Sequence, residues 1–359
     1  MKRKMAALVL AFAMLATLCL TACSKQGEET LNEEKLSPEV SSQYSKEKPL
    51  VLTIGFENGP TDSSVNCGYL WAEMLREKSD GRIKLEVYPS GEMGNASEMF
   101  QMVQEGSLDM VSLIPVTLGN FDPRLELAAI PGLFGSLEEG ESFDRDGFIG
   151  DYIESVYNEI GVTRMVHGEP NFYYFMTTNK AGAITSIDTM KNMKLRIPSS
   201  PITKTFFEVA GAVPTTVSWG EIYTSLQRNV IDGITNNLVW SVTAKFPEVA
   251  QTISLLPVNY HTSDWLLNLD KWNSIPADLQ EIIKSCADEI EGTMRTNWNT
   301  TVEKNMTDME ASGVNFVEVS DEQIAEFRSQ CFDLMSDYIV SVWGQDMLDR
   351  LEAEVINAG

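Results

Sequence analysis

The chain has 359 residues, of which 43% are hydrophobic and 22% are charged, and this balance excludes a wholly disordered protein. Asp and Glu total 52 against 27 Lys and Arg, so the net charge is −25 at pH 7, which argues against binding to nucleic acid or to anionic lipid headgroups. With two histidines, His167 and His261, a zinc site built on three imidazoles is also excluded.

Residues 1–22 have the pattern of a bacterial signal peptide. The basic residues 2–4 precede an apolar run over residues 6–20, which is too short for a comfortable transmembrane helix. The run ends in the sequence LTAC over residues 20–23, which resembles the lipobox of bacterial lipoproteins. We therefore expect Cys23 to carry a lipid that anchors the chain outside the cytoplasmic membrane without spanning it. An ordinary secretory signal with an incidental cysteine is the alternative.

Residues 23–49 are rich in Glu, Lys and Ser and hold almost no large apolar side chains. Such a segment cannot bury enough apolar surface to offset the entropy of ordering it. We predict a flexible tether that holds the folded part of the chain away from the membrane.

The folded part is expected to begin with alternating strands and helices. Hydrophobic patterns predict strands over residues 50–56, 83–87 and 108–113, and apolar residues at helical spacing predict helices over residues 63–78 and 97–104. Strands joined through helices usually pair in parallel, since the crossover returns the chain to the same end of the sheet. We therefore predict a largely parallel sheet with helices on both faces.

A longer mixed series follows and ends in two long helices. Further helices are predicted over residues 142–160, 201–209, 220–227 and 237–246. Further strands are predicted over residues 162–166, 172–178, 194–197, 213–217, 231–233 and 265–269. The two C-terminal helices carry apolar stripes over residues 279–290 and 324–342.

Three cysteines follow Cys23, namely Cys67, Cys286 and Cys331, and three thiols cannot all pair. Cys286 and Cys331 lie on the apolar stripes of the two C-terminal helices. They are interpreted first as small buried side chains and second as a disulfide.

Two α/β lobes on a secreted, tethered chain are typical of a periplasmic-binding-protein-like fold. We assign residues 50–171 to lobe I, with part of residues 258–359 returning to it, and residues 172–257 to lobe II. The C-terminal helices, residues 276–359, are expected to pack across both lobes. Ligands of such proteins bind in the cleft where strand ends of the two lobes face each other.

No catalytic motif stands out in the sequence, which contains no HExxH, GxSxG or CxxC motif and no glycine-rich phosphate loop. Pairs of carboxylates are frequent in so acidic a chain, so no single pair indicates catalysis. We therefore expect neither a cofactor nor a metal, and the residues give no positive support for an enzyme.

Residues 186–237 carry the most informative pattern in the chain. The ordered motifs there are Met190-Lys191, Lys194–Pro198 (KLRIP), Gly211-Ala212, Pro214-Thr215, Glu221–Tyr223, Leu226-Gln227, Ile231–Gly233 and Asn236. Residues 88–94 and 106–109, His261 and Trp272-Asn273 extend the pattern in both directions. Over about residues 50–287 the chain resembles the solute-binding subunits of tripartite ATP-independent periplasmic (TRAP) transporters, the DctP-like family.

The resemblance assigns a ligand role to Arg196, which occupies the place of the family's arginine at a strand end. That arginine forms a salt bridge with the substrate carboxylate. A guanidinium group offers a planar fork that matches a carboxylate in a bidentate pair. The structural alternative is an arginine that extends to solvent or pairs with one of the many acidic residues.

Asn236 and Trp219 also fall on family positions that contact the ligand. The resemblance implies that the Asn236 amide donates to the same carboxylate and that the Trp219 indole covers the ligand. A turn residue after Asp-Gly is the alternative for Asn236, and core packing is the alternative for Trp219.

Three positions depart from the family pattern and shape the expected pocket. Tyr174 stands where sialic-acid binders and many dicarboxylate binders place a second arginine, and Ile114 replaces an expected polar residue. Glu57 follows the first strand, where an asparagine or another polar group often contacts the ligand. We predict a monocarboxylate with an apolar or aromatic body. Because a buried Glu57 would need a partner, an amino acid or a sugar acid stays open.

The resemblance implies that the chain captures a small organic acid by closure of its two lobes and delivers it to separate membrane permease subunits. Uptake in this family is driven by an ion gradient. A secreted lipoprotein enzyme that acts on an organic acid is one alternative, and a lipoprotein that senses a ligand without transport is another. The identity of the ligand stays open.

Overall fold

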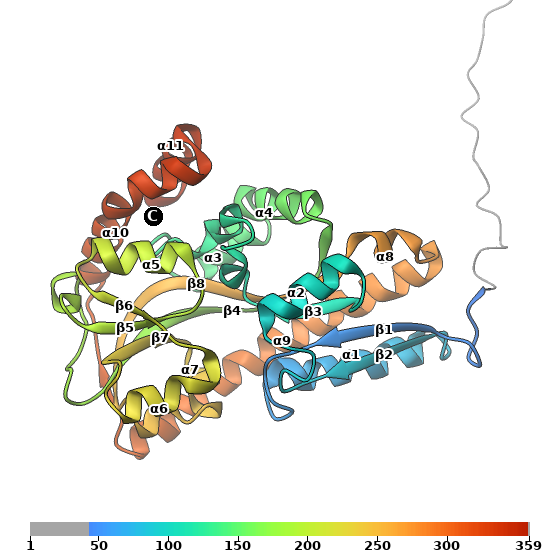
Figure 1. Cartoon of the computed structure of the whole chain (residues 1–359), viewed down its shortest axis with the longest axis horizontal. Coiled ribbons are helices and arrows are strands. Elements are labelled where there is room, and N and C mark those ends of the chain that lie inside the picture. The colour runs from blue at the N-terminus through green and yellow to red at the C-terminus, as the bar shows by residue number, and fades with distance from the viewer. Residues whose placement is uncertain (1–42, 358–359) are drawn as a thin grey trace, which may run out of the picture. The chain divides into compact units, whose positions relative to one another are not determined.

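The computed structural model describes residues 43–357, and these residues belong to one compact unit (Figure 1). The predicted signal peptide (residues 1–22), Cys23 and most of the predicted tether (residues 23–49) lie outside the described residues. Within residues 43–357, no helix combines the length and the apolar character that a membrane crossing requires.

A mixed sheet forms the centre of this unit (Figure 1). Its strands follow the order β2-β1-β3-β8-β4-β7-β5-β6, and β9 pairs with β8. The strands are β1 (Leu50–Gly55), β2 (Ile83–Tyr88), β3 (Met110–Leu113), β4 (Val162–Thr177), β5 (Lys194–Ile197), β6 (Val213–Thr216), β7 (Gly233–Asn236), β8 (Thr252–Asn268) and β9 (Asn315–Val317).

Helices pack around the sheet, and several begin at caps that the sequence supplies. The helices are α1 (Ser63–Lys78), α2 (Ala96–Glu105), α3 (Leu137–Asp144), α4 (Phe148–Glu159), α5 (Pro201–Val209), α6 (Ile222–Gln227), α7 (Leu238–Thr243), α8 (Leu269–Ser274), α9 (Ala277–Ala311), α10 (Asp321–Trp343) and α11 (Gln345–Leu351). Asn95 and Ser320 form capping boxes with Glu98 and Gln323 at the starts of α2 and α10. The α/β class and the long C-terminal helices are therefore confirmed.

The strands of the first predicted series, β1, β2 and β3, pair in parallel as predicted, whereas the long strands at the centre of the sheet, which the sequence did not predict, bring in antiparallel pairs. β1 pairs in parallel with β2 and β3, and β5 pairs in parallel with β6 and β7. Between these groups, β8 runs antiparallel to β3 and β4, and β4 runs antiparallel to β7. The cause is the unexpected length of β4 and β8, which are shared by both ends of the sheet.

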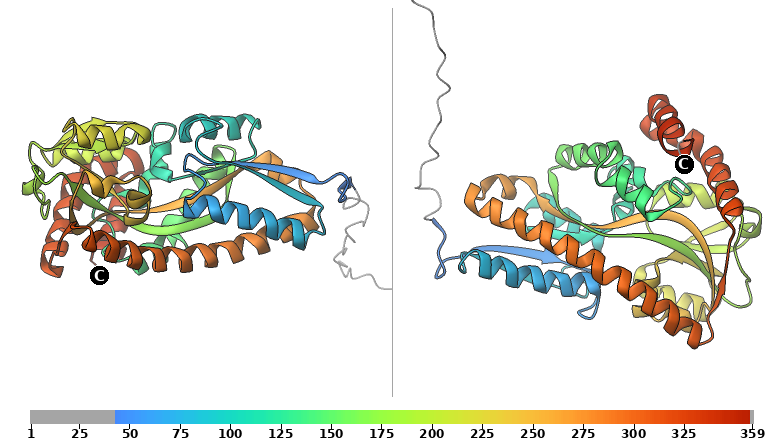
Figure 2. Two further views of the ribbon diagram at one scale, coloured as in Figure 1. Left: turned by 90° about the horizontal axis from the view of Figure 1, so that it is seen from below. Right: turned by 180° about the vertical axis from the view of Figure 1, so that it is seen from behind.

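β4 and β8 are continuous strands of 16 and 17 residues, although the sequence predicted only fragments of them. In β4, register shifts between Gly168 and Asn171 and around Tyr174 interrupt the regular alternation, so one strand was predicted as two. In β8, polar residues such as Asn259 and Ser263 are buried, so no alternation of polar and apolar residues marks the strand. The two strands pair along most of their length and connect the ends of the sheet (Figures 1 and 2).

The predicted lobe boundaries fall inside these long strands, because residues 171 and 172 lie in β4 and residues 257 and 258 lie in β8. α9, the long orange helix in Figure 2, contacts α1, β4 and α7, which are elements assigned to both lobes. α10 packs against α5 and the short turn Pro123–Ala129. The division into two lobes remains a prediction.

The predicted helix over residues 142–160 is two helices, α3 and α4. α3 starts earlier, because the Ser136 side chain accepts a hydrogen bond from the Glu139 backbone N–H. Gly147, with extended backbone, stands at the start of α4 and separates it from α3. The apolar residues continue at helical spacing across this short break, so the sequence pattern predicts one helix where there are two.

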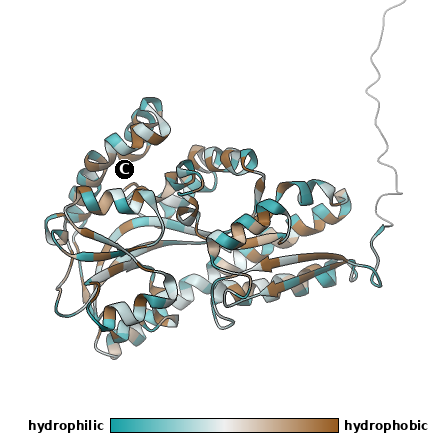
Figure 3. Ribbon diagram, viewed as in Figure 1, coloured by the Kyte–Doolittle hydropathy of each residue, from teal (hydrophilic) through white to brown (hydrophobic). Residues whose placement is uncertain are grey.

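Apolar side chains gather along the strands, as Figure 3 shows for β1. One group of the core joins β1, α1 and α9 through residues such as Leu52 and Trp71. Among the described residues, Cys67, Cys286 and Cys331 are buried free thiols. The interpretation of these cysteines as small buried side chains is confirmed, and the disulfide is not formed.

Two glycines in helices predict opposite effects of the same substitution. A Cβ at the buried Gly150 of α4 would lie 1.9 Å from the Asp144 carbonyl oxygen, whereas a Cβ at the exposed Gly292 of α9 meets nothing within 4 Å. We expect Gly150→Ala to lower the free energy of unfolding by about 1–3 kcal/mol or more. Gly292→Ala should raise it by about 0.5–1 kcal/mol, because alanine has the higher helix propensity.

Urea unfolding followed by circular dichroism measures both effects. Equal midpoints for Gly150→Ala and the wild type would contradict the packing of α4 against the end of α3.

Candidate binding site

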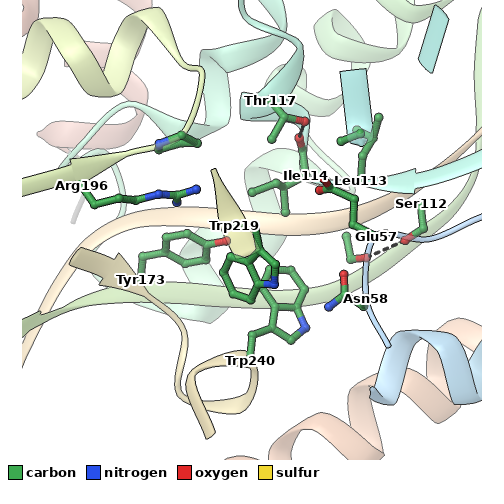
Figure 4. Close-up of a pocket in the computed structure, with 13 residues that line it drawn as sticks. Glu57, Asn58, Ser112, Leu113, Ile114, Thr117, Tyr173, Arg196, Trp219 and Trp240 are labelled. Carbon is green, nitrogen blue, oxygen red and sulfur yellow. Dashed lines mark hydrogen bonds between the residues drawn. The ribbon is translucent and has the colours of Figure 1, made fainter. Parts of the chain in front are cut away.

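A pocket lies where the parallel strands β1, β3 and β5 end, which is the usual place for ligands in α/β proteins (Figure 4). Its walls come from two sets of segments. The first set is the residues that follow β1 and β3 and the end of β5, and the second set is the middle of β4 and β8 and the start of α7. The lining residues are Glu57, Asn58, Ala96, Ser112, Leu113, Ile114, Thr117, Tyr173, Arg196, Pro198, Trp219, Trp240 and Ser263.

Arg196 in β5 is the pocket's positive charge. Its side chain is 8% exposed, and its Nε donates a hydrogen bond of 3.0 Å to the Val217 carbonyl oxygen. Burial lowers the pKa of Arg196 to about 10, with Tyr173 and Glu57 opposing the shift, so the guanidinium stays charged at neutral pH. Within residues 43–357, no carboxylate forms an ion pair with it. The guanidinium points into the pocket and is free to bind an anion (Figure 4).

Aromatic side chains form the wall beneath Arg196 (Figure 4). Trp219 lies in a short turn before α6, and its ring packs edge-on against Phe246 at 5.3 Å between centroids. Trp240, in the first turn of α7, packs against Trp298 of α9 at 5.9 Å. Tyr173 packs against Trp240 at 6.5 Å. These contacts pack each ring against a neighbouring aromatic side chain and restrict its rotation.

Glu57 and Asn58 lie across the pocket from Arg196, next to Ser112 (Figure 4). Burial raises the pKa of Glu57, while a backbone hydrogen bond from Ala96 and the charge of Arg196 oppose the shift. The Oγ atoms of Ser112 and Ser263 lie 3.3 Å apart across β3 and β8. This end of the pocket is therefore polar and carries a carboxylate.

A second buried carboxylate supports the loop that bears Asn58. Asn58 donates a 3.0 Å hydrogen bond to Asp62, which caps α1. Glu169, at the register shift of β4, accepts hydrogen bonds from the hydroxyls of Ser63 (3.3 Å) and Ser64 (2.9 Å) in the first turn of the same helix. Burial and the nearby Asp62 raise the pKa of Glu169 to about 8. This carboxyl group connects the start of α1 to the strand that joins the two ends of the sheet.

Four of the residues expected from the sequence line this pocket, namely Arg196, Trp219, Glu57 and Ile114. Asn236 is 2% exposed, and its amide donates to the Ser241 hydroxyl at 2.9 Å, so its side chain points into the protein.

Tyr174 packs between two groups of core residues, and its neighbour Tyr173 lines the pocket instead. Successive side chains of a strand point to opposite faces, so a shift of one position moves the side chain away from the pocket.

Several lining residues were missed by the sequence reasoning, above all Tyr173, Asn58 and Trp240. One signal could have identified Trp240. It lies in the first turn of a predicted helix that directly follows a short strand, which is where an α/β fold places ligand contacts. The Nε1 atom of Trp240 is buried without a hydrogen-bond partner in the described residues. Among these residues, no group of three or more His, Cys, Asp or Glu is placed to hold a metal ion.

A family model and individual relatives of this chain both describe solute-binding proteins. The family model of bacterial extracellular solute-binding proteins, family 7 (DctP), matches residues 56–339. The 2,3-diketo-L-gulonate-binding periplasmic protein YiaO of Escherichia coli K12 is 28% identical over 268 residues, which cover 74% of this chain and 80% of YiaO. The ectoine-binding periplasmic protein TeaA of Halomonas elongata is 24% identical over 287 residues, which cover 78% and 83% of the two chains.

A solved structure supports the same fold. The TRAP periplasmic solute-binding protein of Roseobacter denitrificans with bound β-D-glucuronate superposes with a TM-score of 0.79 at 19% identity. The superposition covers 85% of this chain and all of that protein.

The raised pKa of Glu169 predicts a pH-dependent stability. An acid whose pKa rises from its ordinary 4.5 to about 8 on folding binds its proton more tightly in the folded state. The free energy of unfolding should therefore fall as the pH rises from about 5 to about 8, by on the order of a few kcal/mol. Glu169→Gln removes this titration and keeps one acceptor oxygen for a serine hydroxyl, while its amide N–H can donate to the other hydroxyl, so its stability should depend less on pH.

Urea unfolding at a series of pH values from 5 to 8.5 tests this difference. If the curves of the wild type and Glu169→Gln run parallel over the whole range, Glu169 is ionised in the folded protein.

Proposed function

The chain belongs to the bacterial extracellular solute-binding proteins, family 7, and we propose that Arg196 anchors the carboxylate of its ligand. The protein is a TRAP-type extracytoplasmic receptor for small organic acids and not an enzyme. The observation that carries the proposal is a charged guanidinium, buried in the pocket, that has no ion-pair partner among residues 43–357. A buried charge without a partner is costly, so a ligand carboxylate that neutralises it gains binding free energy.

The geometry of the guanidinium supports a carboxylate in particular. Nε of Arg196 is already occupied by the Val217 carbonyl oxygen, so the terminal Nη groups are left for the ligand. A carboxylate can accept two parallel hydrogen bonds from such a fork. In a pocket that excludes water, this pair is stronger than the same pair at the surface.

The rest of the pocket supports a monocarboxylate whose body packs against aromatic and aliphatic side chains. Trp219, Trp240 and Tyr173 offer flat faces, and Ile114 lies opposite them. Arg196 is the one Lys or Arg among the residues that line the pocket. A C4-dicarboxylate would therefore bury its second charge without a cation.

The place of the pocket between segments assigned to different lobes supports a role in transport. Glu57 and Ile114 belong to the predicted lobe I, whereas Arg196 and Trp219 belong to the predicted lobe II. A ligand that contacts both groups favours a closed state, which would then be delivered to the membrane permease of a TRAP transporter. The register shifts in β4 are a natural place for bending between the lobes.

Cys23 is proposed as the site of lipidation, with residues 23–49 as the tether. The lipobox-like sequence at residues 20–23 supports this anchor, and the segment lies outside the described residues.

Substitution of Arg196 tests the proposed anchor. A thermal-shift screen of organic acids, which includes 2,3-diketo-L-gulonate, ectoine and D-glucuronate, identifies a ligand, since a ligand of the folded state raises its stability. We expect Arg196→Ala to weaken binding of that ligand by roughly 2–5 kcal/mol in calorimetry, as for a buried charge pair that loses one partner. Arg196→Lys should also weaken binding, because lysine lacks the bidentate fork.

Arg228→Ala provides the matched control, since Arg228 is exposed and does not line the pocket. An affinity of Arg196→Ala equal to that of Arg228→Ala would rule out the anchor.

The lipid anchor predicts a change in localisation on substitution of Cys23. Cys23→Ser, or a chain that starts at Ser24 behind a cleavable secretory signal, should release folded, ligand-binding protein into the aqueous phase. Detergent phase partitioning and labelling with a radioactive fatty acid measure this. Protein that stays with the membrane after Cys23→Ser would require a different anchor.

A further inference from the structure

We propose that the ligand of this pocket is a zwitterion, with its carboxylate on Arg196 and its cationic group between the Glu57 carboxylate and the faces of Trp219 and Trp240. This inference rests on the proposed function and narrows the ligand class. It concerns the charge that the ligand carries at the end of the pocket away from Arg196.

The charge balance of the pocket is the first argument. Among the residues that line it, Arg196 and Glu57 are the two that carry a full charge when ionised, and the charges are opposite. An empty pocket is therefore neutral overall. A simple anion on Arg196 would leave Glu57 as an unbalanced buried carboxylate, whereas a zwitterion keeps the closed pocket neutral.

The surroundings of Glu57 are the second argument. Within residues 43–357, no Lys, Arg or His lies within ion-pair distance of its carboxylate, and Arg196 lies across the pocket from it (Figure 4). The backbone N–H of Ala96 and the charge of Arg196 favour the ionised form of Glu57, and the nearby Glu98 adds a repulsive charge. A carboxylate accepts up to four hydrogen bonds, so most of its acceptor capacity faces the pocket. The N–H groups of a ligand cation would satisfy it.

The two indole rings are the third argument. The face of a tryptophan ring carries negative electrostatic potential and attracts a cation within about 6 Å of the ring centre. Trp219 and Trp240 lie between Arg196 and the end of the pocket that holds Glu57 (Figure 4). Hydroxyl groups of a sugar acid could also donate to Glu57, but they would gain nothing from these faces and would leave its charge in place.

Pairs of ligands that match in size and shape but differ in the cationic nitrogen test the inference. L-proline is compared with cyclopentanecarboxylate, and L-phenylalanine with 3-phenylpropanoate. The cyclic zwitterion ectoine is added, together with D-glucuronate as a hydroxylated anion and succinate as a dianion. In calorimetry at neutral pH, we expect at least one zwitterion to bind with a Kd below about 1 mM and at least about tenfold more tightly than the anions.

Substitutions then separate the two ends of the pocket. Glu57→Gln keeps the shape of the side chain. It should weaken binding of the zwitterion by about tenfold or more, while the affinity for the anions stays unchanged or increases. Arg196→Ala should weaken the binding of zwitterions and of anions alike. Glu92→Gln is the control, since Glu92 is exposed and does not line the pocket. Circular dichroism confirms that each variant is folded.

The number of protons taken up on binding gives a second measurement. It would not differ between ligands if Glu57 had only a structural role. Binding enthalpies in buffers of different ionisation enthalpy report the protons taken up with the ligand. We expect the zwitterion to bind with an uptake of close to zero protons. An anion should take up a substantial fraction of a proton, since its charge favours protonation of Glu57.

Three results would overturn the inference. An anion could bind as tightly as the best zwitterion, or Glu57→Gln could leave the ratio of zwitterion and anion affinities unchanged. The third is that no zwitterion binds with a Kd below about 1 mM. If anions bind in an Arg196-dependent way in these cases, the proposed anchor stands and only the ligand class is wrong. If carboxylates bind equally well to Arg196→Ala, the proposed anchor itself fails.

Discussion

The buried guanidinium of Arg196 is the constraint on which the site depends. This residue is 8% exposed, and among residues 43–357 its side chain makes one hydrogen bond, to the Val217 carbonyl oxygen; a buried charge of this kind is tolerated only where its surroundings are arranged for it. Its lowered pKa of about 10 reports the cost of burial, while the distance of that value from neutral pH keeps the group charged. The terminal Nη groups of this charged side chain therefore keep donor capacity that faces the pocket, which is why we propose it as the anchor for a carboxylate.

The long strands β4 and β8 determine which side chains can meet at this donor. They carry Tyr173 and Ser263 into the pocket and connect the strands that end at Glu57 with the strand that carries Arg196. Behind the aromatic wall, Trp298 places α9 against Trp240, so the longest helix supports the site through its core packing. Under the proposed closure of the two lobes, small bends at the register shifts of this shared sheet would alter the width of the pocket.

Much of this arrangement was predictable from local patterns, and the failures have identifiable causes. α1, α5 and β5 were predicted with the bounds that the structure has, because caps, a proline in the first turn and alternating apolar residues mark them. The antiparallel centre of the sheet was not predictable, since the strand that contains Asn259 and Ser263 buries polar residues on both faces. Tyr174 was chosen where Tyr173 lines the pocket, because a family pattern does not specify the face of a strand near a register shift.

The overall charge of the protein adds a final constraint on how an acid can be bound. A net charge of −25 repels anions at long range, but at physiological ionic strength this repulsion decays over about 8 Å. The field of Arg196 is shielded from salt by burial, so attraction dominates only inside the pocket. In our proposal, Glu57 sets how much negative charge the pocket accepts, because its carboxylate lies across the same small space and forms no ion pair among residues 43–357. On this proposal, binding of an acid by so acidic a protein is a local property of these two side chains and the rings between them.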